Sequence, residues 1–191
     1  MDFINDIYIT NGEKVKSTLL NEGLVYSTIF DNVSDTSVSI CDDEQFINID
    51  TSNIDDLQKM MDLETDEDWR FYINQTIEFL KDKPKNADET DIIGIKKGGC
   101  LISYLRVSSN YYSQYNMNIK NIGFPYTVKS ERKKGYASRL LQYYMNNPAN
   151  IGTLFVYYIP KKDNIASRNL AEKCGFKFEG IRKHYLFEVE E

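Results

Sequence analysis

The sequence is poor in the residues that build several common kinds of functional site. Its 191 residues include one histidine, four prolines and three cysteines, Cys41, Cys100 and Cys174. An odd number of scattered cysteines without metal-ligand spacing indicates reduced thiols, which are typical of a cytoplasmic protein. The residues needed for a Ser–His–Asp arrangement, a pair of catalytic carboxylates or a metal cluster do not occur in a recognisable pattern. We therefore expect no bound metal.

Long hydrophobic runs are also missing. No apolar stretch approaches the roughly 20 residues that a membrane-spanning helix requires. The N-terminal sequence MDFINDIYIT is acidic and does not resemble a signal peptide. The composition, with 41% hydrophobic residues, is that of a folded globular domain. These features predict a cytoplasmic protein without a membrane partner.

Charge is distributed unevenly along the chain. Residues 1–90 contain 21 Asp and Glu against 7 Lys and Arg, whereas residues 91–191 contain 8 against 16. A basic half suits nucleic acid or a small polyanion. The acidic half argues against a general nucleic-acid surface, because phosphate contacts dominate such binding. It is either a solvated acidic surface or a complement to a cationic substrate, and we expect no nucleic-acid partner.

Hydrophobic periodicity divides the chain into an extension and one domain. Residues 1–43 alternate short apolar runs with polar breaks and form an N-terminal extension of unknown role, followed by a domain over 44–191. The predicted strands are 46–49, 92–95, 100–107, 118–128, 153–159 and one or two strands over 176–188, and the predicted helices are 52–61, 65–80, 135–146 and 163–174. Ser52 and Asp55 resemble a capping box, and residues 108–117 predict a loop. Two strand–helix units beside a hairpin-linked sheet indicate a mixed α+β fold.

The most informative segment is YTVKSERKKGYASRLL, residues 126–141. A strand leads into a basic loop and then into a helix that begins at Gly135, so that unpaired backbone N–H groups point at one place where the helix dipole favours an anion. Gly135 lets a phosphate oxygen approach the backbone, and three cations precede it. The pattern predicts a diphosphate or polyphosphate site; the alternative is a helix that begins with a solvated basic turn. Neither G-x-x-x-x-G-K-[ST] nor G-x-G-x-x-G is present, so nucleoside triphosphatases and dinucleotide enzymes have little support.

Two motifs resemble those of the GNAT acyltransferase superfamily. Residues 132–137, RKKGYA, resemble its pyrophosphate signature R/Q-x-x-G-x-G/A. Residues 164–182 resemble the run N-x-x-S…E-K-x-G-F-x-x-E-G-x-x-R of the subgroup that acetylates ribosomal-protein amino termini, polyamines and some antibiotics. The resemblance covers residues 46–189. It implies a GNAT-like α+β domain with a mixed, mostly antiparallel central sheet flanked by helices.

The resemblance also implies an activity and a set of binding residues. The activity is direct transfer of the acetyl group of acetyl-CoA to a primary amine of a small molecule or peptide. The coenzyme-binding residues that it implies are Thr127, Val128, Arg132, Lys133, Lys134, Gly135, Tyr136, Ala137 and Asn164. A backbone N–H near 127–128 would polarise the thioester carbonyl. The resemblance implies no metal and leaves a monomer and a homodimer open.

The catalytic residues are less clearly marked. Many relatives carry a catalytic tyrosine at the position of Ala171, so Ser167 becomes the candidate proton donor to the thiolate. Ser167 is equally compatible with an ordinary helix serine, and Asn164 with a helix cap. The strand 118–128 contains no Asp or Glu, which leaves a water relay or a base from elsewhere in the chain. Two other hypotheses stay open: a CoA-binding module with regulatory or weak activity, and an RNA-binding protein that uses the basic loop.

Overall fold

The computed structural model describes residues 15–30, 41–82, 90–112 and 117–189. Within them, the strands form a seven-stranded sheet in the order β2-β3-β4-β5-β6-β1-β7. The strands are β1 (Val15–Ile29), β2 (Glu44–Asn48), β3 (Thr90–Lys97), β4 (Cys100–Tyr112), β5 (Met117–Thr127), β6 (Leu154–Ile159) and β7 (Lys177–Val189). Neighbouring strands are antiparallel except β5 and β6, which are parallel. The predicted mixed and mostly antiparallel α+β sheet is confirmed.

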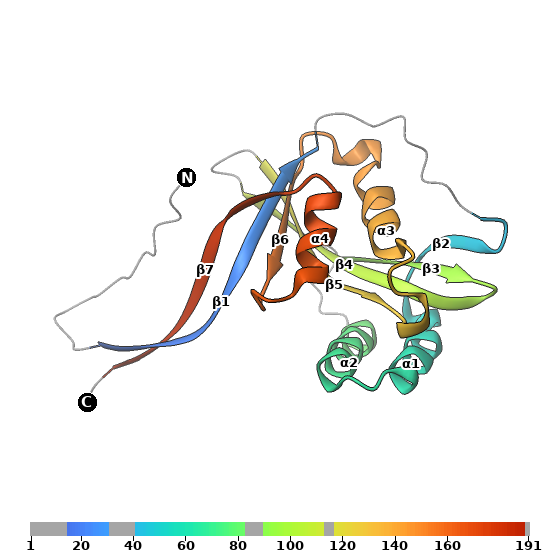
Figure 1. Ribbon diagram of the computed structural model, residues 1–191, viewed down its shortest axis with the longest axis horizontal. Coiled ribbons are helices and arrows are strands. Elements are labelled where there is room, and N and C mark those ends of the chain that lie inside the picture. The colour runs from blue at the N-terminus through green and yellow to red at the C-terminus, as the bar shows by residue number, and fades with distance from the viewer. Residues whose placement is uncertain (1–14, 31–40, 83–89, 113–116, 190–191) are drawn as a thin grey trace.

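Helices cover both faces of this sheet. They are α1 (Ile54–Leu63), α2 (Glu67–Lys81), α3 (Tyr136–Met145) and α4 (Ile165–Lys173). Figure 1 shows α1 and α2 on one face and α3 and α4 on the other. A hydrophobic cluster lies under each pair of helices. The inward face predicted for α3 is confirmed, because its four members are all buried: Tyr136, Leu140, Leu141 and Tyr144.

The first helix is capped by a different residue from the one that its sequence suggests. The predicted capping box of Ser52 and Asp55 is wrong, because Asp50 caps a short 3-10 turn, η1 (Thr51–Asn53), that leads into α1. The Asp50 carboxylate accepts a hydrogen bond from the Ser52 backbone N–H at 2.8 Å, and the Asn53 side chain accepts one from the Asp50 backbone N–H at 3.2 Å. The same reciprocal pattern therefore occurs two residues earlier.

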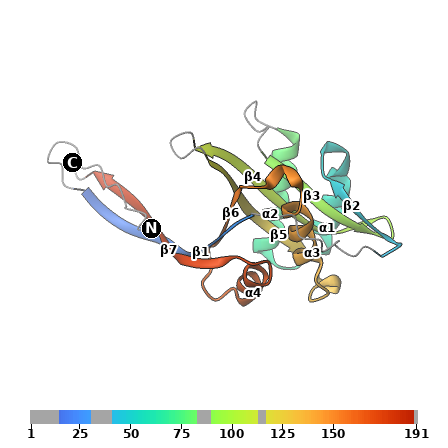
Figure 2. The same ribbon diagram turned by 90° about the horizontal axis from the view of Figure 1, so that it is seen from above.

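Strand β1 lies inside the sheet, although it belongs to the predicted N-terminal extension. It pairs with β6 over Leu24–Ile29 and with β7 along most of its length. Leu24, Tyr26 and Phe30 are buried in the cluster under α3 and α4. Figures 1 and 2 show the outer parts of β1 and β7 running together away from the helices as a two-stranded ribbon. The boundary predicted at residue 43 therefore leaves one strand of the sheet, β1, in the N-terminal extension.

The loop predicted over residues 108–117 is shorter in the structure. Strand β4 continues to Tyr112 and β5 begins at Met117, and the backbone pairing includes Ser108 with Asn121. Residues 113–116 of the predicted loop lie outside the described residues. A long antiparallel ladder stabilises these polar residues as strand, because backbone pairing does not depend on an apolar side-chain period.

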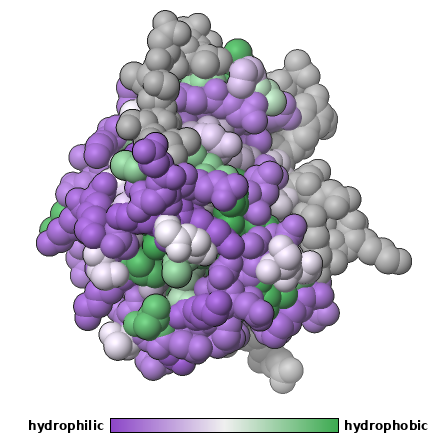
Figure 3. Space-filling view, turned by 90° about the vertical axis from the view of Figure 1, so that its right-hand side faces the viewer, coloured by the Kyte–Doolittle hydropathy of each residue, from purple (hydrophilic) through white to green (hydrophobic). Residues whose placement is uncertain are grey.

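The described surface shows no large apolar area on the face drawn in Figure 3. That face, at the right of Figure 1, is mostly hydrophilic, with small separated hydrophobic patches. Exposed large hydrophobic residues lie on different elements, for example Leu63 at the end of α1 and Ile165 at the start of α4. No helix in the described part of the chain is long and apolar enough to cross a membrane.

Candidate functional site

The two parallel strands at the centre of the sheet separate toward their C-terminal ends. Paired residues of β5 and β6 run from Ile119 with Leu154 to Ile122 with Tyr157. Beyond that point β5 pairs with β4, and β6 pairs with β1. We call this opening the fork. The chain leads from one arm of the fork into α3 and from the other into α4.

An irregular backbone marks the β5 arm of the fork. The register between β4 and β5 shifts between Arg106 paired with Gly123 and Tyr104 paired with Tyr126. Phe124, inside the shifted segment, has a φ of 51°. A positive φ is uncommon for an aromatic residue, and such bulges re-aim side chains beside functional sites.

The loop between β5 and α3 presents free backbone donors. After a 3-10 turn, η4 (Lys129–Glu131), Lys133 has a φ of 65° and Gly135 has a φ of 86°. Gly135 is the N-cap of α3, and no side chain caps this helix. The first hydrogen bond into the helix is donated by Arg139 N to Gly135 O at 3.0 Å. The N–H groups of the preceding turn therefore lack intrahelical partners and carry the positive end of the helix dipole.

The three predicted cations of this loop are not equivalent. Arg132 pairs with Glu64, and Lys134 donates to Glu131 at 2.9 Å. Lys133 has no ion pair or hydrogen bond to any residue in the described part of the chain. The electrostatic attraction for an anion therefore comes from the helix terminus and Lys133 more than from the sum of three positive charges.

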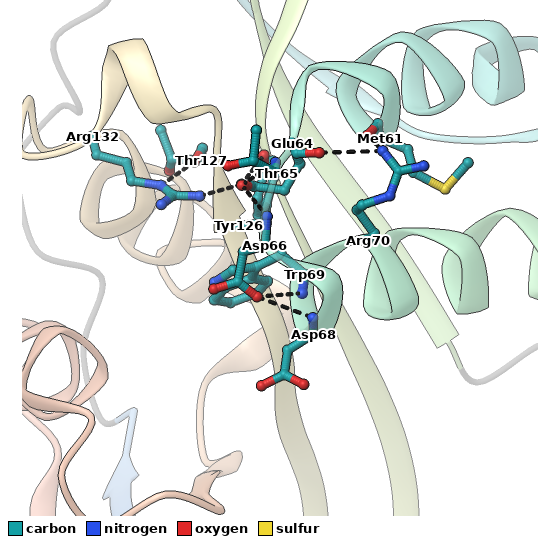
Figure 4. Close-up of polar contacts among 10 residues, drawn as sticks. All are labelled: Met61, Glu64, Thr65, Asp66, Asp68, Trp69, Arg70, Tyr126, Thr127 and Arg132. Atoms are coloured by element: carbon teal, nitrogen blue, oxygen red, sulfur yellow. Dashed lines mark hydrogen bonds and ion pairs between the residues drawn. The ribbon is translucent and has the colours of Figure 1, made fainter.

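Arg132 reaches from the surface to Glu64, a buried carboxylate on the other face of the fork (Figure 4). The Glu64 side chain is 1% exposed and its two oxygens accept four hydrogen bonds. Their donors are Thr65 N at 2.8 Å, Asp66 N at 3.0 Å, the Tyr126 hydroxyl at 2.8 Å and Arg132 Nη2 at 2.5 Å. Burial raises the pKa of the Glu64 carboxyl, but these hydrogen bonds and the Arg132 charge outweigh burial and lower it. Glu64 is therefore a carboxylate at neutral pH.

The predicted residues at the end of β5 use most of their polar groups within the protein. The Thr127 carbonyl accepts from Arg132 Nε at 2.9 Å, and its hydroxyl lies 2.9 Å from the Ser103 hydroxyl. The Val128 N–H donates to the Ile102 carbonyl at 2.9 Å. This N–H is therefore not free to polarise a carbonyl in this conformation, which was the role expected near 127–128.

The remaining residues of the loop motif contribute through the backbone. The Tyr136 side chain is buried against the sheet, and its hydroxyl accepts a hydrogen bond from Lys97 Nζ at 3.1 Å. Ala137 follows in the first turn of α3, and the Ser138 hydroxyl donates to the Gly135 carbonyl at 2.9 Å. Positions 136 and 137 thus offer N–H groups, not side chains, to an anion.

Helix α4 brings two predicted residues together on the other arm of the fork. The Asn164 side chain caps α4 by accepting a hydrogen bond from Ser167 N at 3.0 Å. Burial raises the pKa of Tyr157 to about 12, and a hydrogen bond with the Ser167 side chain partly offsets this rise. Tyr157 is the last residue of β6 that pairs with β5. Ser167 therefore lies against the base of the fork, while Ala171 is fully buried.

The comparison with known families agrees with this geometry. A model of the acetyltransferase (GNAT) family matches residues 54–176, which is more than half of the chain. The chain belongs to the acetyltransferase (GNAT) family. This is a family of acyltransferase enzymes, and the matched residues span the fork, the loop before α3 and helix α4. No curated protein sequence matches the chain.

Solved structures share the fold of this acetyltransferase at low sequence identity. A functionally unknown conserved protein from Staphylococcus epidermidis is 12% identical with a TM-score of 0.61, and the match covers 93% of this chain and 64% of that protein. A ribosomal-protein-alanine N-acetyltransferase from Brucella melitensis is 14% identical with a TM-score of 0.52, covering 68% and 89%. An aminoglycoside acetyltransferase from an uncultured soil sample is 7% identical with a TM-score of 0.56, covering 80% and 100%. The chain spans less than two thirds of the first of these proteins, and all three likenesses show the fold alone.

Sequence reasoning missed an aromatic wall beside the fork. Tyr72 of α2 stacks on Phe124 with ring centroids 4.9 Å apart, and the ring centroids of Trp69 and Tyr126 are 5.3 Å apart. Helical spacing did place Trp69 and Tyr72 on one face of α2, but nothing in the sequence indicated that this face meets the bulge of β5. Among the described residues, no group of three or more His, Cys, Asp and Glu side chains is placed to hold a metal ion.

Proposed function

We propose that this acetyltransferase binds acetyl-CoA at the N-terminus of α3 and transfers its acetyl group directly to a primary amine. The observation that carries the proposal is the uncapped first turn of α3, which follows a glycine at a φ of 86° and lies at the end of one arm of the fork. An ideal Cβ at Gly135 would meet only the Ser138 hydroxyl, at 3.8 Å. A diphosphate can therefore approach the backbone closely.

The fork supplies the path for the rest of the donor. A thioester chain that extends from α3 between the diverging strands would reach the side of α4 where Ser167 contacts Tyr157. The amine would enter from the face of α1 and α2, where the aromatic wall lies. Donor and acceptor would thus meet at the base of the fork, which is the arrangement that direct transfer requires.

The proton balance assigns a role to Ser167. When the neutral amine attacks the thioester carbonyl carbon, the C–N bond forms, the C–S bond breaks and the sulfur requires a proton. We propose that the Ser167 hydroxyl donates it, held in place by Tyr157. The surplus proton on nitrogen leaves to water, and Ser167 regains a proton from solvent.

The acceptor subgroup rests on the sequence of α4 and β7. The Asn164 cap, Ser167 and the following GFKFEG segment resemble the enzymes that acetylate ribosomal-protein amino termini and polyamines. We propose that the chain belongs to that subgroup and that its acceptor is an amine on a small molecule or peptide, with no nucleic-acid or membrane partner. A weakly active CoA-binding module is the alternative, and it is favoured by alanine at position 171.

The test is product formation with a panel of amines. The full chain is incubated with acetyl-CoA and, separately, a polyamine, an aminoglycoside and peptides with different amino termini. Free thiol is measured together with the mass of the amine product. The expected result is that one class of amine gains the mass of one acetyl group for each thiol released. Binding of acetyl-CoA without any acetylated amine would favour the alternative module.

A further inference from the structure

Arg132 is the first residue of the RKKGYA motif in the loop between β5 and α3, which we call the phosphate loop. Its side chain donates from Nε to the Thr127 carbonyl at 2.9 Å and from Nη2 to Glu64 at 2.5 Å. Its guanidinium also lies 5.5 Å from the centre of the Tyr126 ring. Figure 4 shows it directed toward the turn between α1 and α2. The charge is thus already paired within the protein.

Glu64 joins three segments that are distant in sequence. Through Thr65 and Asp66 it holds the turn between α1 and α2, through Tyr126 it holds the end of β5, and through Arg132 it holds the phosphate loop. The same turn is fixed from its other side by Arg70, whose Nη1 donates to the carbonyls of Met61 at 2.8 Å and Glu64 at 3.2 Å. A displacement of one segment would therefore break hydrogen bonds to the other two.

Burial makes this carboxylate difficult to replace. Glu64 is a charged group with a side-chain exposure of 1%, and its hydrogen bonds compensate for the lost hydration. Removal of Arg132 would leave this buried carboxylate with less compensation, whereas the Arg132 side chain is 38% exposed and can be hydrated when Glu64 is removed. Its lowered pKa and complete set of hydrogen bonds make it unsuited to accept a proton from the amine.

We propose that Glu64 is a positioning residue that fixes the phosphate loop through Arg132, and that Arg132 acts on the coenzyme through this loop and not as a phosphate ligand. This inference rests on the proposed acetyl-CoA site. It follows that the turn between α1 and α2 and the phosphate loop move together, because Glu64 connects them. Donor affinity therefore depends on a carboxylate that lies on the acceptor side of the fork.

Calorimetric titration of CoA into four proteins tests the proposal: the wild type, Glu64→Gln, Arg132→Met and the double variant. If Glu64 positions the loop, each single variant binds CoA about 10-fold or more weakly, since each loses a hydrogen bond to a charged group. The double variant binds no more weakly than the weaker single variant, because one linkage is broken in all three. If Arg132 were a phosphate ligand restrained by Glu64, Glu64→Gln would bind as tightly as the wild type or more tightly, which would overturn the proposal.

Two further variants separate positioning from bulk charge and from misfolding. Arg132→Lys keeps the positive charge but cannot bond both the Thr127 carbonyl and Glu64, so we expect it not to restore affinity. Glu78→Gln on α2 removes an exposed pair with Lys81 and should bind CoA like the wild type. In steady-state kinetics Glu64→Gln should raise the KM for acetyl-CoA more than it lowers kcat, whereas a general structural loss would lower the active fraction and hence kcat alone. Failure of the wild type to bind CoA would instead contradict the proposed function.

Discussion

At Gly135 the backbone takes a φ of 86°, a value that side chains other than those of Asn and Asp rarely tolerate. Glycine is therefore needed for the conformation as well as for access of an anion to the N–H groups of α3. These two requirements predict different results for different substitutions, because Asn and Asp have the same shape but differ in charge.

We predict that Gly135→Asp abolishes coenzyme binding, whereas Gly135→Asn only weakens it. Both side chains suit a positive φ, but the aspartate would place a negative charge against the diphosphate and against the N–H groups that bind it. The expected gap in the Kd for CoA is about 10-fold or more. Calorimetry on the two variants measures it, and equal affinities would show that the phosphates lie elsewhere.

Ser167→Ala tests the proposed proton donor. We expect kcat to fall by about 100-fold, within the usual contribution of general acid catalysis, with the Kd for acetyl-CoA unchanged. The Asn164 cap should survive, because it bonds the backbone N–H of residue 167 and not the side chain. Unchanged turnover in single-turnover experiments would remove Ser167 from this role.

A buried ion pair makes stability dependent on pH. Arg139 Nη2 lies 2.6 Å from Glu44, whose side chain is 3% exposed. The hydrogen bond from Arg139 lowers the pKa of Glu44 to about 2, against the opposing effect of burial. A depressed folded-state pKa stabilises the protein above the unfolded pKa near 4.5, and this contribution is lost as the pH falls toward 2.

We therefore predict that Glu44→Gln lowers the free energy of unfolding by roughly 1–3 kcal/mol at pH 7. The difference from the wild type should shrink as the pH falls below about 4.5. Denaturant unfolding at several pH values measures both quantities. The exposed control Glu78→Gln should stay close to the wild type throughout, and a Glu44→Gln effect that is constant with pH would exclude the ion pair as its cause.

At the scale of elements, features that depend on a local sequence pattern could be predicted, whereas those that depend on long-range pairing could not. The spacing of Ile73, Ile77 and Leu80 predicted the buried face of α2, and the Gly98–Gly99 turn predicted the β3–β4 hairpin, as the structure shows. Both patterns are local in sequence. Strand β1 was not recognised as part of the sheet, because its partners in β6 and β7 lie more than 120 residues away.

The residues of the candidate site also divide into those that could be predicted from sequence and those that could not. The loop before α3 could be predicted because its glycine, its cations and the following helix are contiguous. Glu64 could not, because a glutamate between two amphipathic helices has the sequence of a solvated turn. Only the fold brings it against Arg132 and Tyr126. The positions of Trp69 and Tyr72 beside the fork depend on the same long-range packing.

Glycine substitutions test the place of β1 in the sheet. A Cβ at Gly23 would lie 2.5 Å from the Ile159 carbonyl and 2.6 Å from the Tyr158 ring, whereas a Cβ at Gly123 would meet only the Arg106 carbonyl, at 3.9 Å. We predict that Gly23→Ala lowers the free energy of unfolding by about 1–3 kcal/mol through overpacking. Gly123→Ala should be neutral or slightly stabilising. Equal stabilities in denaturant titrations would contradict the position of β1 beside β6.

At the scale of the whole molecule, the sheet separates the proposed donor side from the proposed acceptor side, and the fork connects them. Figure 1 shows α3 and α4 on one face of the sheet and α1 and α2 on the other. The first pair carries the uncapped helix terminus and Ser167, and the second pair carries Trp69 and Tyr72 and is joined by the turn that contains Glu64. The acidic N-terminal half of the chain includes α1 and α2, and the basic half includes the phosphate loop. The uneven charge in the sequence thus follows the division between the proposed acceptor and donor sides.

The most direct test of the central claim is a thermal-shift titration of the wild-type chain with acetyl-CoA, CoA and ATP at fixed salt. A ligand that binds only the native state raises the Tm progressively with its concentration. The account predicts a rise with acetyl-CoA and with CoA that exceeds the rise with ATP. No rise with either form of the coenzyme would contradict a coenzyme site at the N-terminus of α3.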